Sequence, residues 1–351
     1  MKVDFIVVGS GLAGTLFCEV LRQQKKTFMV IDDNSQKSSV VAGGLYNPVI
    51  LKRFSSVWKS KEQLKIALPT YKNLEDYLDL KLDYKIPVLR LFSSIEEQNN
   101  WFSACDNPKL SEYLKPKIIS YNNKSIHSEF GFGEVLQTGR IDTKKLIEAF
   151  KAKLNSEDRL LSETCNYDNF KLDNNKVNYK HIESKHIVFS EGFGLKKNPF
   201  FNYLPINGTK GELLIIQAPD LKLEYVLKSS VFLIPIGDDK YIVGATYEWK
   251  DKSNIVTVQA KEELLSKLNS FIKCDYKVVD QIAGIRPTVK DRRPLVGQHP
   301  EYKQLYILNG LGTRGVMIAP YVAHQLFNFI ENNSDLDSEI DIRRFKELKD
   351  A

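Results

Sequence analysis

Three glycines close to the N-terminus stand between an apolar run at residues 3–8 and a segment at 12–24 whose residue types favour a helix. Gly9 permits a tight turn after a buried strand, Gly11 leaves room for a pyrophosphate against the backbone, and Gly14 lets the helix lie close to the strand. The N-terminus of such a helix presents unpaired N–H groups and a positive dipole end to an anion. The spacing therefore predicts a dinucleotide site at this turn.

An acidic residue follows at the distance expected for the second strand of a βαβ unit. The apolar run at residues 27–31 ends in Asp32, and Asp33 comes next. A carboxylate at this place accepts hydrogen bonds from the ribose of an adenosine. The alternative is a glycine-rich turn without a ligand and a solvated acid at a strand end. The order of strand, glycines, helix, strand and acid favours the dinucleotide site.

The composition is that of a globular protein with more than one domain. The chain has 351 residues, of which 42% are hydrophobic and 27% charged. These values argue against a disordered protein and against a membrane protein. The net charge is +6, with acids scattered among the lysines, so the charge indicates a solvated surface rather than a clustered nucleic-acid face.

Neither a metal site nor a leader segment is expected. The four cysteines, Cys18, Cys105, Cys165 and Cys274, lack metal-ligand spacing, and the five histidines are equally unclustered. No apolar run reaches the length of a membrane-spanning helix. Because the first strand begins within three residues of the N-terminus, no room is left for a signal peptide, and we expect a cytoplasmic protein with reduced thiols.

The rest of the chain divides into two patterns. Residues 60–78 have helical spacing that Pro69 interrupts, and residues 143–154 favour an amphipathic helix with Asp142 as its N-cap. A strand at 186–189 runs into the turn at Gly192. Alternating apolar runs at 213–217, 231–235 and 241–245 instead predict an antiparallel sheet.

Two C-terminal stretches resemble a known family. Residues 283–297 carry G-x-R-P-x-x-x-D-x-x-P-x-x-G, and residues 308–320 form a glycine loop before an apolar helical segment. Together with the N-terminal motif and the small-residue loop at 42–48, they resemble the FAD-dependent D-amino-acid oxidase superfamily (DAO family). Within it they are similar to glycine oxidase and to the FAD domain of the bifunctional enzyme that makes 5-methylaminomethyl-2-thiouridine in tRNA.

The resemblance implies an α/β fold, with a Rossmann-like FAD-binding domain and an inserted, mainly antiparallel α+β substrate domain. We expect residues 1–75, 139–205 and 276–345 in the FAD-binding domain, and residues 76–138 and 206–275 in the substrate-binding domain.

The resemblance also implies roles for individual residues. Arg286 aligns with the arginine that binds the substrate carboxylate, a task that suits a planar bidentate guanidinium. The alternative for Arg286 is an ion pair with an acid such as Asp291. Arg314 adds charge near the cofactor or contacts substrate, or it faces solvent. Tyr46, Tyr247 and Trp249 are candidate walls of the substrate pocket, although aromatic residues at strand ends are more often part of a core.

Together with the N-terminal motif, the resemblance assigns these residues to cofactor binding: Gly9, Gly11, Leu12, Ala13, Gly14, Asp32, Asp33, Gly43, Gly44, Leu45, Gly192, Gly310, Gly312, Thr313, Arg314, Gly315 and Val316. The implied cofactor is non-covalent FAD, because no cysteine follows Cys274 in the region where some relatives attach the flavin.

The implied function is oxidation of the C–N bond of an amino acid or N-substituted glycine. A hydride passes to flavin N5, and the imine that remains is hydrolysed. One alternative is oxidation of a carboxymethylaminomethyl base in tRNA, and another is a non-catalytic flavin-binding protein. We expect a small amine or amino acid as partner, tRNA as the alternative, and no membrane; the oligomeric state and the electron acceptor stay open.

Overall fold

The N-terminal apolar run forms β1 (Lys2–Val8), a central strand of an eight-stranded sheet in the computed structural model, which describes residues 1–121, 123–173 and 176–348. β1 lies between two parallel neighbours, β2 (Phe28–Ile31) and β14 (Ile182–Phe189). The chain therefore leaves this sheet and returns to it much later. The remaining strands are β11 (Leu160–Leu161), β12 (Phe170–Asp173), β13 (Lys176–Tyr179), β20 (Leu295–Gln298) and β21 (Leu305–Asn309).

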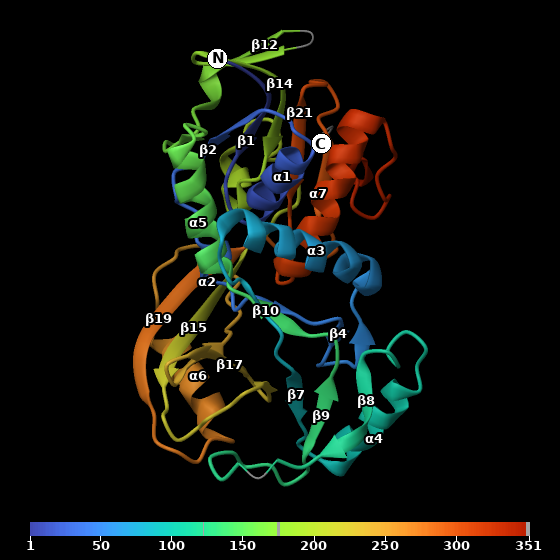
Figure 1. Cartoon of the computed structure of the whole chain (residues 1–351), viewed down its shortest axis with the longest axis vertical. Helices are drawn as coiled ribbons and strands as arrows, with labels where there is room; N and C mark the ends of the chain where they lie inside the picture. The colour runs from blue at the N-terminus through green and yellow to red at the C-terminus, as the bar shows by residue number, and fades with distance from the viewer. Residues whose placement is uncertain (122, 174–175, 349–351) are drawn as a thin grey trace.

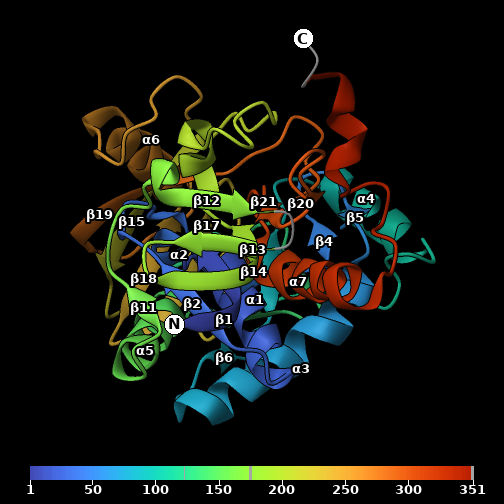
Figure 2. The ribbon, with the colours of Figure 1, turned by 90° about the horizontal axis from the view of Figure 1, so that it is seen from above.

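Helices cover this sheet, whose strands β11, β2, β1, β14 and β21 are parallel while β12, β13 and β20 pair antiparallel. α1 (Leu12–Gln23) packs against α7 (Gly315–Asn332), and α3 (Ser60–Leu78) packs against α7 in turn. Seen from above, the three helices lie together on one side of the strands (Figure 2). The other elements here are α2 (Ser38–Val41), α5 (Thr143–Ser156), η1 (Tyr167–Asn169), η2 (Gly192–Lys197) and η3 (Ile342–Leu348). Parallel strands with helices packed beside them confirm the Rossmann-like part of the expected α/β fold.

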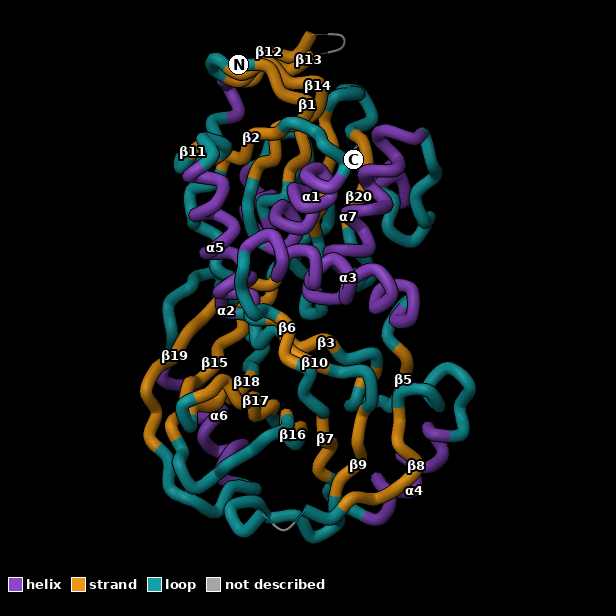
Figure 3. Tube along the Cα trace, viewed as in Figure 1, coloured by secondary structure: helices purple, strands orange, loops and turns teal. Residues whose placement is uncertain are grey.

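A second sheet forms the other half of the molecule, with α3 lying across the middle between them (Figures 1 and 3). Its strands pair antiparallel, apart from β16 with β7, and α6 (Val258–Asn269) packs on one face. In spatial order they are β19 (Lys277–Arg286), β15 (Thr209–Gln217), β18 (Lys240–Gly244), β17 (Phe232–Gly237), β16 (Val226–Lys228), β7 (Val88–Leu91), β9 (Phe132–Val135) and β8 (Leu114–Ile119). The antiparallel sheet predicted from the alternating runs is confirmed.

Short elements complete the fold. They are α4 (Ile95–Cys105), α6 (Val258–Asn269), the small sheet of β3 (Leu45–Tyr46), β10 (Gly139–Ile141) and β6 (Asp83–Tyr84), and the pair β4 (Val49–Ile50) and β5 (Ser55–Ser56). The predicted cap of α5 is confirmed, since the Asp142 carboxylate accepts a hydrogen bond from the N–H of Lys145 at 3.2 Å.

Two expectations differ from the structure. Pro69 does not interrupt α3, which continues through it because buried side chains such as Leu64 and Tyr71 hold the helix in the core.

The boundary expected at residue 276 is also wrong. β19 pairs with β15 along its length, so residues 277–286 belong to the second sheet. With that boundary moved, we propose that the first sheet carries the cofactor and the second the substrate.

Candidate active site

A pocket opens at the carboxyl ends of the parallel strands, where ligands bind in open α/β sheets. Its walls come from residues 9–13 after β1, Asp32 and residues 36–40 after β2, residues 190–192 after β14, and Asn309 and Leu311 at the end of β21. Of the predicted cofactor residues, Gly9, Gly11, Leu12, Ala13, Asp32 and Gly192 line this pocket.

The glycine turn is shaped by close backbone contacts. Gly9 has φ +94°, and a Cβ there would lie 2.6 Å from the carbonyl oxygen of Ser190. A Cβ on Gly14 would lie 1.9 Å from the carbonyl oxygen of Gly9. Both contacts are far shorter than a side chain tolerates, so these positions require glycine. Gly14 does not line the pocket; it allows α1 to begin directly against the turn.

The pocket offers hydrogen-bonding groups that lack protein partners. The hydroxyl oxygens of Ser10 and Ser190 are buried and have no hydrogen-bond partner within the described residues. The N-cap of α1 is Gly11, which has no side chain to accept hydrogen bonds from the first turn of the helix. Of the N–H groups in that turn, that of Leu12 donates to Ser39 Oγ at 2.9 Å. Unpartnered hydroxyls beside a helix N-terminus fit an oxyanion such as a phosphate.

Asp32 is held in place at the end of β2. Its carboxylate accepts hydrogen bonds from the N–H of Ser10 at 2.6 Å and that of Asn34 at 2.8 Å, and it pairs with Lys151 Nζ at 2.7 Å. Asp33 instead accepts from the N–H of Ser35 and the hydroxyl of Thr164, outside the pocket lining. Asp32 thus has the predicted place, while Lys151, which the sequence did not single out, adds a cation beside it.

Glu191 is a buried acid in the same pocket. Its carboxylate accepts hydrogen bonds from Asn198 Nδ2 at 2.7 Å and from the Tyr167 hydroxyl. Burial nevertheless raises the pKa of Glu191 to about 7, and the charge of Asp33 acts in the same direction. The sequence marks this position only as an acid where the resemblance leads one to expect a small residue.

The raised pKa makes stability depend on pH. The folded chain binds the proton of Glu191 more tightly than the unfolded chain, whose pKa is near 4.5, so the stabilisation is complete below pH 4.5 and lost as pH rises through about 7. At about 1.4 kcal/mol per pKa unit, the effect is on the order of 3 kcal/mol. Glu191→Gln keeps the acceptor oxygen but should remove this dependence. Urea unfolding of the cofactor-free wild type and variant at pH 5 and pH 8 measures the change in the free energy of unfolding with pH. An equal change in both proteins would contradict this prediction.

The two C-terminal motifs meet beside this pocket. The N–H of Gly312 donates to the carbonyl oxygen of Pro287 at 3.1 Å, and Asn309 Nδ2 donates to the carbonyl oxygen of Gly192 at 3.0 Å. Gly310 and Gly312 have φ of +73° and +59°, and the loop leads into α7. Of the other predicted residues of this loop, Thr313 is exposed, Gly315 begins α7 next to Leu12, and Val316 follows it and is buried.

The small-residue loop joins the two halves. A Cβ on Gly43 would lie 2.8 Å from Ile234 Cδ1 in the second sheet, and one on Gly44 would lie 1.9 Å from the carbonyl oxygen of Ile141. Leu45 follows in β3. These three residues are outside the lining of the pocket described above, so the structure leaves their cofactor role a prediction.

Arg286 ends β19 and lies over the neighbouring strand. Its Nη1 donates to the carbonyl oxygen of Thr246 at 3.3 Å and to that of Lys210 at 3.5 Å. The guanidinium carbon lies 4.6 Å from the ring centre of Tyr247. The alternative ion pair with Asp291 is not formed, since Asp291 pairs with Arg344 at 2.8 Å.

Gly211 makes room for this guanidinium. A Cβ there would lie 2.0 Å from Arg286 Nη2. Gly211 is not among the predicted site residues, although a glycine inside a strand indicates close approach by another group.

We therefore expect Gly211→Ala to displace the guanidinium of Arg286 and to raise the KM for a carboxylate substrate by about tenfold or more, because small misplacements of binding groups are costly. The FAD content should stay that of the wild type. Steady-state kinetics with a thermal melt as folding control test this, and a KM within twofold of wild type would contradict the placement.

Two arginines share a site without an acidic partner. Arg314 Nη1 donates to the carbonyl oxygen of Asn47 at 3.4 Å, and both Arg314 and Arg286 interact electrostatically with Tyr247. Burial is the main cause that lowers the pKa of each arginine. Among residues 1–121, 123–173 and 176–348, no carboxylate lies within ion-pair distance of either guanidinium. Such a site is suited to a carboxylate from outside the chain.

The three predicted pocket aromatics differ in position. Tyr247 and Trp249 are 59% and 55% exposed, and Tyr247 stacks on Arg286. The assignment of Tyr46 to the pocket wall is wrong. Its ring is buried in the core, and its hydroxyl donates to Asp83 Oδ1 at 2.8 Å. The polar end of the side chain therefore already has a hydrogen-bond partner within the protein.

In the part of the chain that the structure describes, no group of three or more His, Cys, Asp or Glu side chains is arranged to hold a metal ion. Over the same residues, no helix combines the length and apolar character needed to cross a bilayer.

Comparison with known proteins places the chain among flavoenzymes. Residues 4–328 match the family model described as FAD dependent oxidoreductase (DAO). The chain is 27% identical to the glycine oxidase of Bacillus subtilis over 158 residues, which are 43% of this chain and 42% of that protein. It is 24% identical to the tRNA 5-methylaminomethyl-2-thiouridine biosynthesis bifunctional protein of Legionella pneumophila over 325 residues, 86% of this chain and 47% of that one.

A solved structure confirms the fold. The glycine oxidase of Bacillus cereus superposes with a TM-score of 0.76 at 17% identity, covering 95% of this chain and 96% of that one. The alignments with the two curated relatives above each cover less than half of the relative's length.

Proposed function

The chain belongs to the DAO family of FAD-dependent oxidoreductases, and from that premise we propose that it oxidises the C–N bond of an amino acid or N-substituted glycine. The imine formed is then hydrolysed by water. The observation that carries the proposal is the pair of half-buried arginines, Arg286 and Arg314, which have no acidic partner in the described chain and lie beside the exposed ring of Tyr247.

The pocket beyond β1 has the chemistry to hold FAD, which is the cofactor of this family. The glycine turn and the N-terminus of α1 would receive the pyrophosphate, the free hydroxyls of Ser10 and Ser190 would donate to it, and Asp32 would accept from the adenosine ribose. We propose that binding is non-covalent. When bound, FAD supplies the acceptor for the hydride that leaves the substrate carbon.

Arg286 would set the position of the substrate. Its planar guanidinium can donate two parallel hydrogen bonds to a carboxylate and so fix the distance and orientation of the adjacent C–N bond. Gly211 below it and Tyr247 beside it limit where the guanidinium can lie. Arg314 would add a second positive charge on the same side. In this role the chain contributes orientation rather than proton transfer.

A second candidate substrate is a carboxymethylaminomethyl base in tRNA. The observation that favours it is the exposed rim next to Arg286, where Tyr247 and Trp249 offer aromatic faces and Lys250 is exposed. Aromatic rings stack on bases, and lysines contact phosphates. The relative with the wider alignment is named for a tRNA modification, which agrees with this alternative.

The visible spectrum of the purified protein under anaerobic conditions tests both proposals. Glycine, sarcosine, iminodiacetate, a panel of D-amino acids and tRNA bearing the modified base are added separately. Bleaching of the yellow protein by a small amine identifies the substrate class, whereas bleaching by the tRNA alone selects the second candidate. If none of them bleaches the protein, both proposals are contradicted.

A further inference from the structure

A buried lysine lies next to the proposed carboxylate site and has no role in the function proposed above. Lys210, in β15, is only 1% exposed. Its Nζ pairs with Asp251 Oδ2 at 2.5 Å and with Glu212 Oε1 at 3.3 Å, and it also donates to the carbonyl oxygen of Ile255. A lysine is rarely buried unless it is paired, so an interior position for this residue needs a structural reason.

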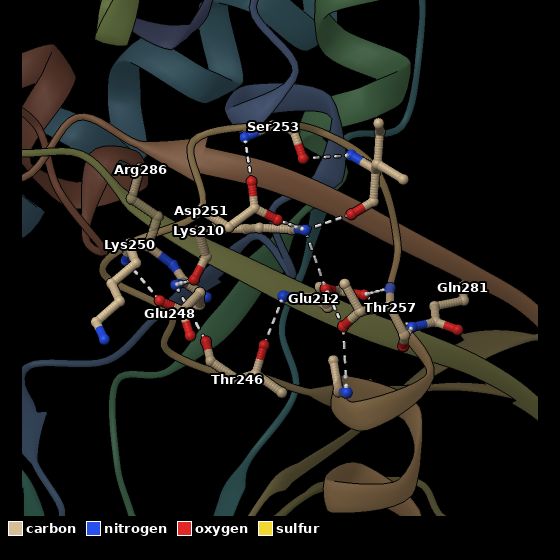
Figure 4. Close-up of polar contacts among 12 residues, drawn as sticks. Lys210, Glu212, Thr246, Glu248, Lys250, Asp251, Ser253, Thr257, Gln281 and Arg286 are labelled. Carbon is tan, nitrogen blue, oxygen red and sulfur yellow. Dashed lines mark hydrogen bonds and ion pairs between the residues drawn. The ribbon is translucent and has the colours of Figure 1, made fainter.

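Apart from Glu212, which is also in β15, these partners of Lys210 belong to one loop, residues 246–257, between β18 and α6. The backbone N–H of Lys210 donates to the carbonyl oxygen of Glu248, and the N–H of Glu248 donates to the carbonyl oxygen of Lys210, both at 2.9 Å. These bonds hold the first part of the loop. Its side chain reaches Asp251 (Figure 4) and also the carbonyl oxygen of Ile255, further along the loop. Asp251 in turn accepts from the N–H of Ser253 at 2.7 Å, which fixes the turn between them. One residue of β15 thus holds both sides of the loop.

Glu212 anchors the end of the same loop. Its carboxylate accepts from the N–H and hydroxyl of Thr257, both at 2.9 Å, and from Gln281 Nε2 at 2.7 Å. The N–H of Glu212 donates to Thr246 Oγ1 at 2.9 Å, at the beginning of the loop. These contacts are drawn in Figure 4, where the side chains converge on β15. Both ends of the loop are therefore fixed by β15.

The loop provides most of the surroundings of Arg286. The guanidinium donates to the carbonyl oxygens of Thr246 and Lys210, and the ring of Tyr247 stacks on it. The outer side chains Trp249 and Ile255 are 55% and 72% exposed, so apolar burial contributes little to holding this part of the loop. Polar contacts therefore hold it against Arg286. They are the ion pair of Lys210 with Asp251, the backbone pairing of Lys210 with Glu248, and the hydrogen bond from Lys252 Nζ to the carbonyl oxygen of Gly208 at 2.9 Å.

We propose that Lys210 and Asp251 are a positioning pair, which fixes the 246–257 loop so that Arg286 and Tyr247 are set for binding the substrate carboxylate. The inference rests on the proposed function, because it assumes that Arg286 binds that carboxylate. Neither residue of the pair touches the substrate. Their contribution is to substrate affinity, through the loop, rather than to the chemical step.

The test uses the FAD-loaded enzyme and two readouts that do not need turnover. The first is the dissociation constant of acetate, followed by perturbation of the flavin absorbance. The second is the rate of trypsin cleavage after Lys250 and Lys252, mapped by mass spectrometry. Asp251→Asn is the main variant, because Glu212 still compensates Lys210 when the Asp251 charge is removed. Lys210→Met is the second variant.

Lys115→Met is the matched control, since it removes an ion pair of 2.8 Å with Glu134 elsewhere in the second sheet. Asp251→Asn should weaken acetate binding about fivefold or more, because a misplaced binding group is costly, and should speed loop cleavage about tenfold. Lys115→Met should change neither. With an identified substrate, KM should rise while kcat stays within about twofold.

The outcomes separate this inference from the proposed function. Faster cleavage with unchanged acetate binding, or unchanged cleavage, overturns the positioning role. An Arg286→Met variant distinguishes the other case. If acetate does not perturb the wild-type spectrum, or binds Arg286→Met equally well, the carboxylate role of Arg286 fails, and the inference fails with it. Restoration of both readouts in Asp251→Glu would support the pair.

Discussion

Methionine in place of Arg286 is expected to raise the KM for the amine substrate on the order of 100-fold, while the protein remains yellow. Removing one partner of a buried, charge-assisted hydrogen bond leaves the other partner unpaired and costs about 2–5 kcal/mol of binding free energy. About 1.4 kcal/mol corresponds to a factor of ten in affinity. FAD should remain bound, because Arg286 does not line the pocket at the carboxyl ends of the parallel strands. Steady-state kinetics and the flavin-to-protein ratio measure the two effects.

Arg286→Lys is the matched variant for this prediction. It keeps the positive charge but loses the planar fork that donates two parallel hydrogen bonds. We expect a KM between those of wild type and Arg286→Met, because charge and geometry both contribute. A KM in Arg286→Met within a few-fold of wild type would remove Arg286 from the substrate site and leave Arg314 as the candidate for binding the carboxylate.

The dinucleotide turn could be predicted from the sequence because its signals are local. Gly9, Gly11 and Gly14 follow a short apolar strand. A Cβ on Gly14 would meet Gly9 in the same turn, and one on Gly9 would meet Ser190 at the end of the adjacent strand, whereas the nearest atom to a Cβ on Gly11 is the Ser39 hydroxyl oxygen. The cap of α5 by Asp142 is equally local, since an N-cap contacts the first turn of its own helix. Local rules of backbone conformation and capping are therefore enough for this part of the fold.

The surroundings of Arg286 could not be predicted in the same way. The guanidinium is positioned by Gly211, Thr246 and Tyr247, which come from other segments of the second sheet. Only the pairing of β19 with β15 brings these residues to the guanidinium. The same pairing contradicts the domain boundary that was predicted at residue 276. Tyr46 was misplaced for the same reason, because its burial depends on Asp83 and on the strand that carries Gly139.

Glu191 shows a different limit, because its residue type does not predict its charge. An acid in a sequence is expected to be ionised, and only the structure shows that Asn198 and Tyr167 surround this one in a buried pocket. Burial then raises its pKa to about 7. Environment, rather than residue type, decides the charge that this group presents to a cofactor.

Alanine in place of Gly14 is expected to abolish retention of FAD and to destabilise the fold. A Cβ there would lie 1.9 Å from the carbonyl oxygen of Gly9 and 3.0 Å from its carbon, and both are backbone atoms that cannot rotate away. Alanine favours a helix over glycine by about 1 kcal/mol, but overpacking of a tight contact typically costs about 1–3 kcal/mol and displaces backbone. The helix must therefore move away from the turn that we propose receives the pyrophosphate.

Gly194→Ala is the control for this prediction, because it makes the same chemical change where the nearest atom, at 3.3 Å, belongs to the flexible side chain of Gln36. It should keep FAD and its melting temperature, whereas Gly14→Ala should elute colourless and melt earlier. Added FAD separates the two effects of Gly14→Ala. If the fold is only weakened, ligand binding restores the melting temperature by mass action; if the helix has moved, it does not. Full FAD retention by Gly14→Ala would mean that α1 and the turn are not tied together by this contact.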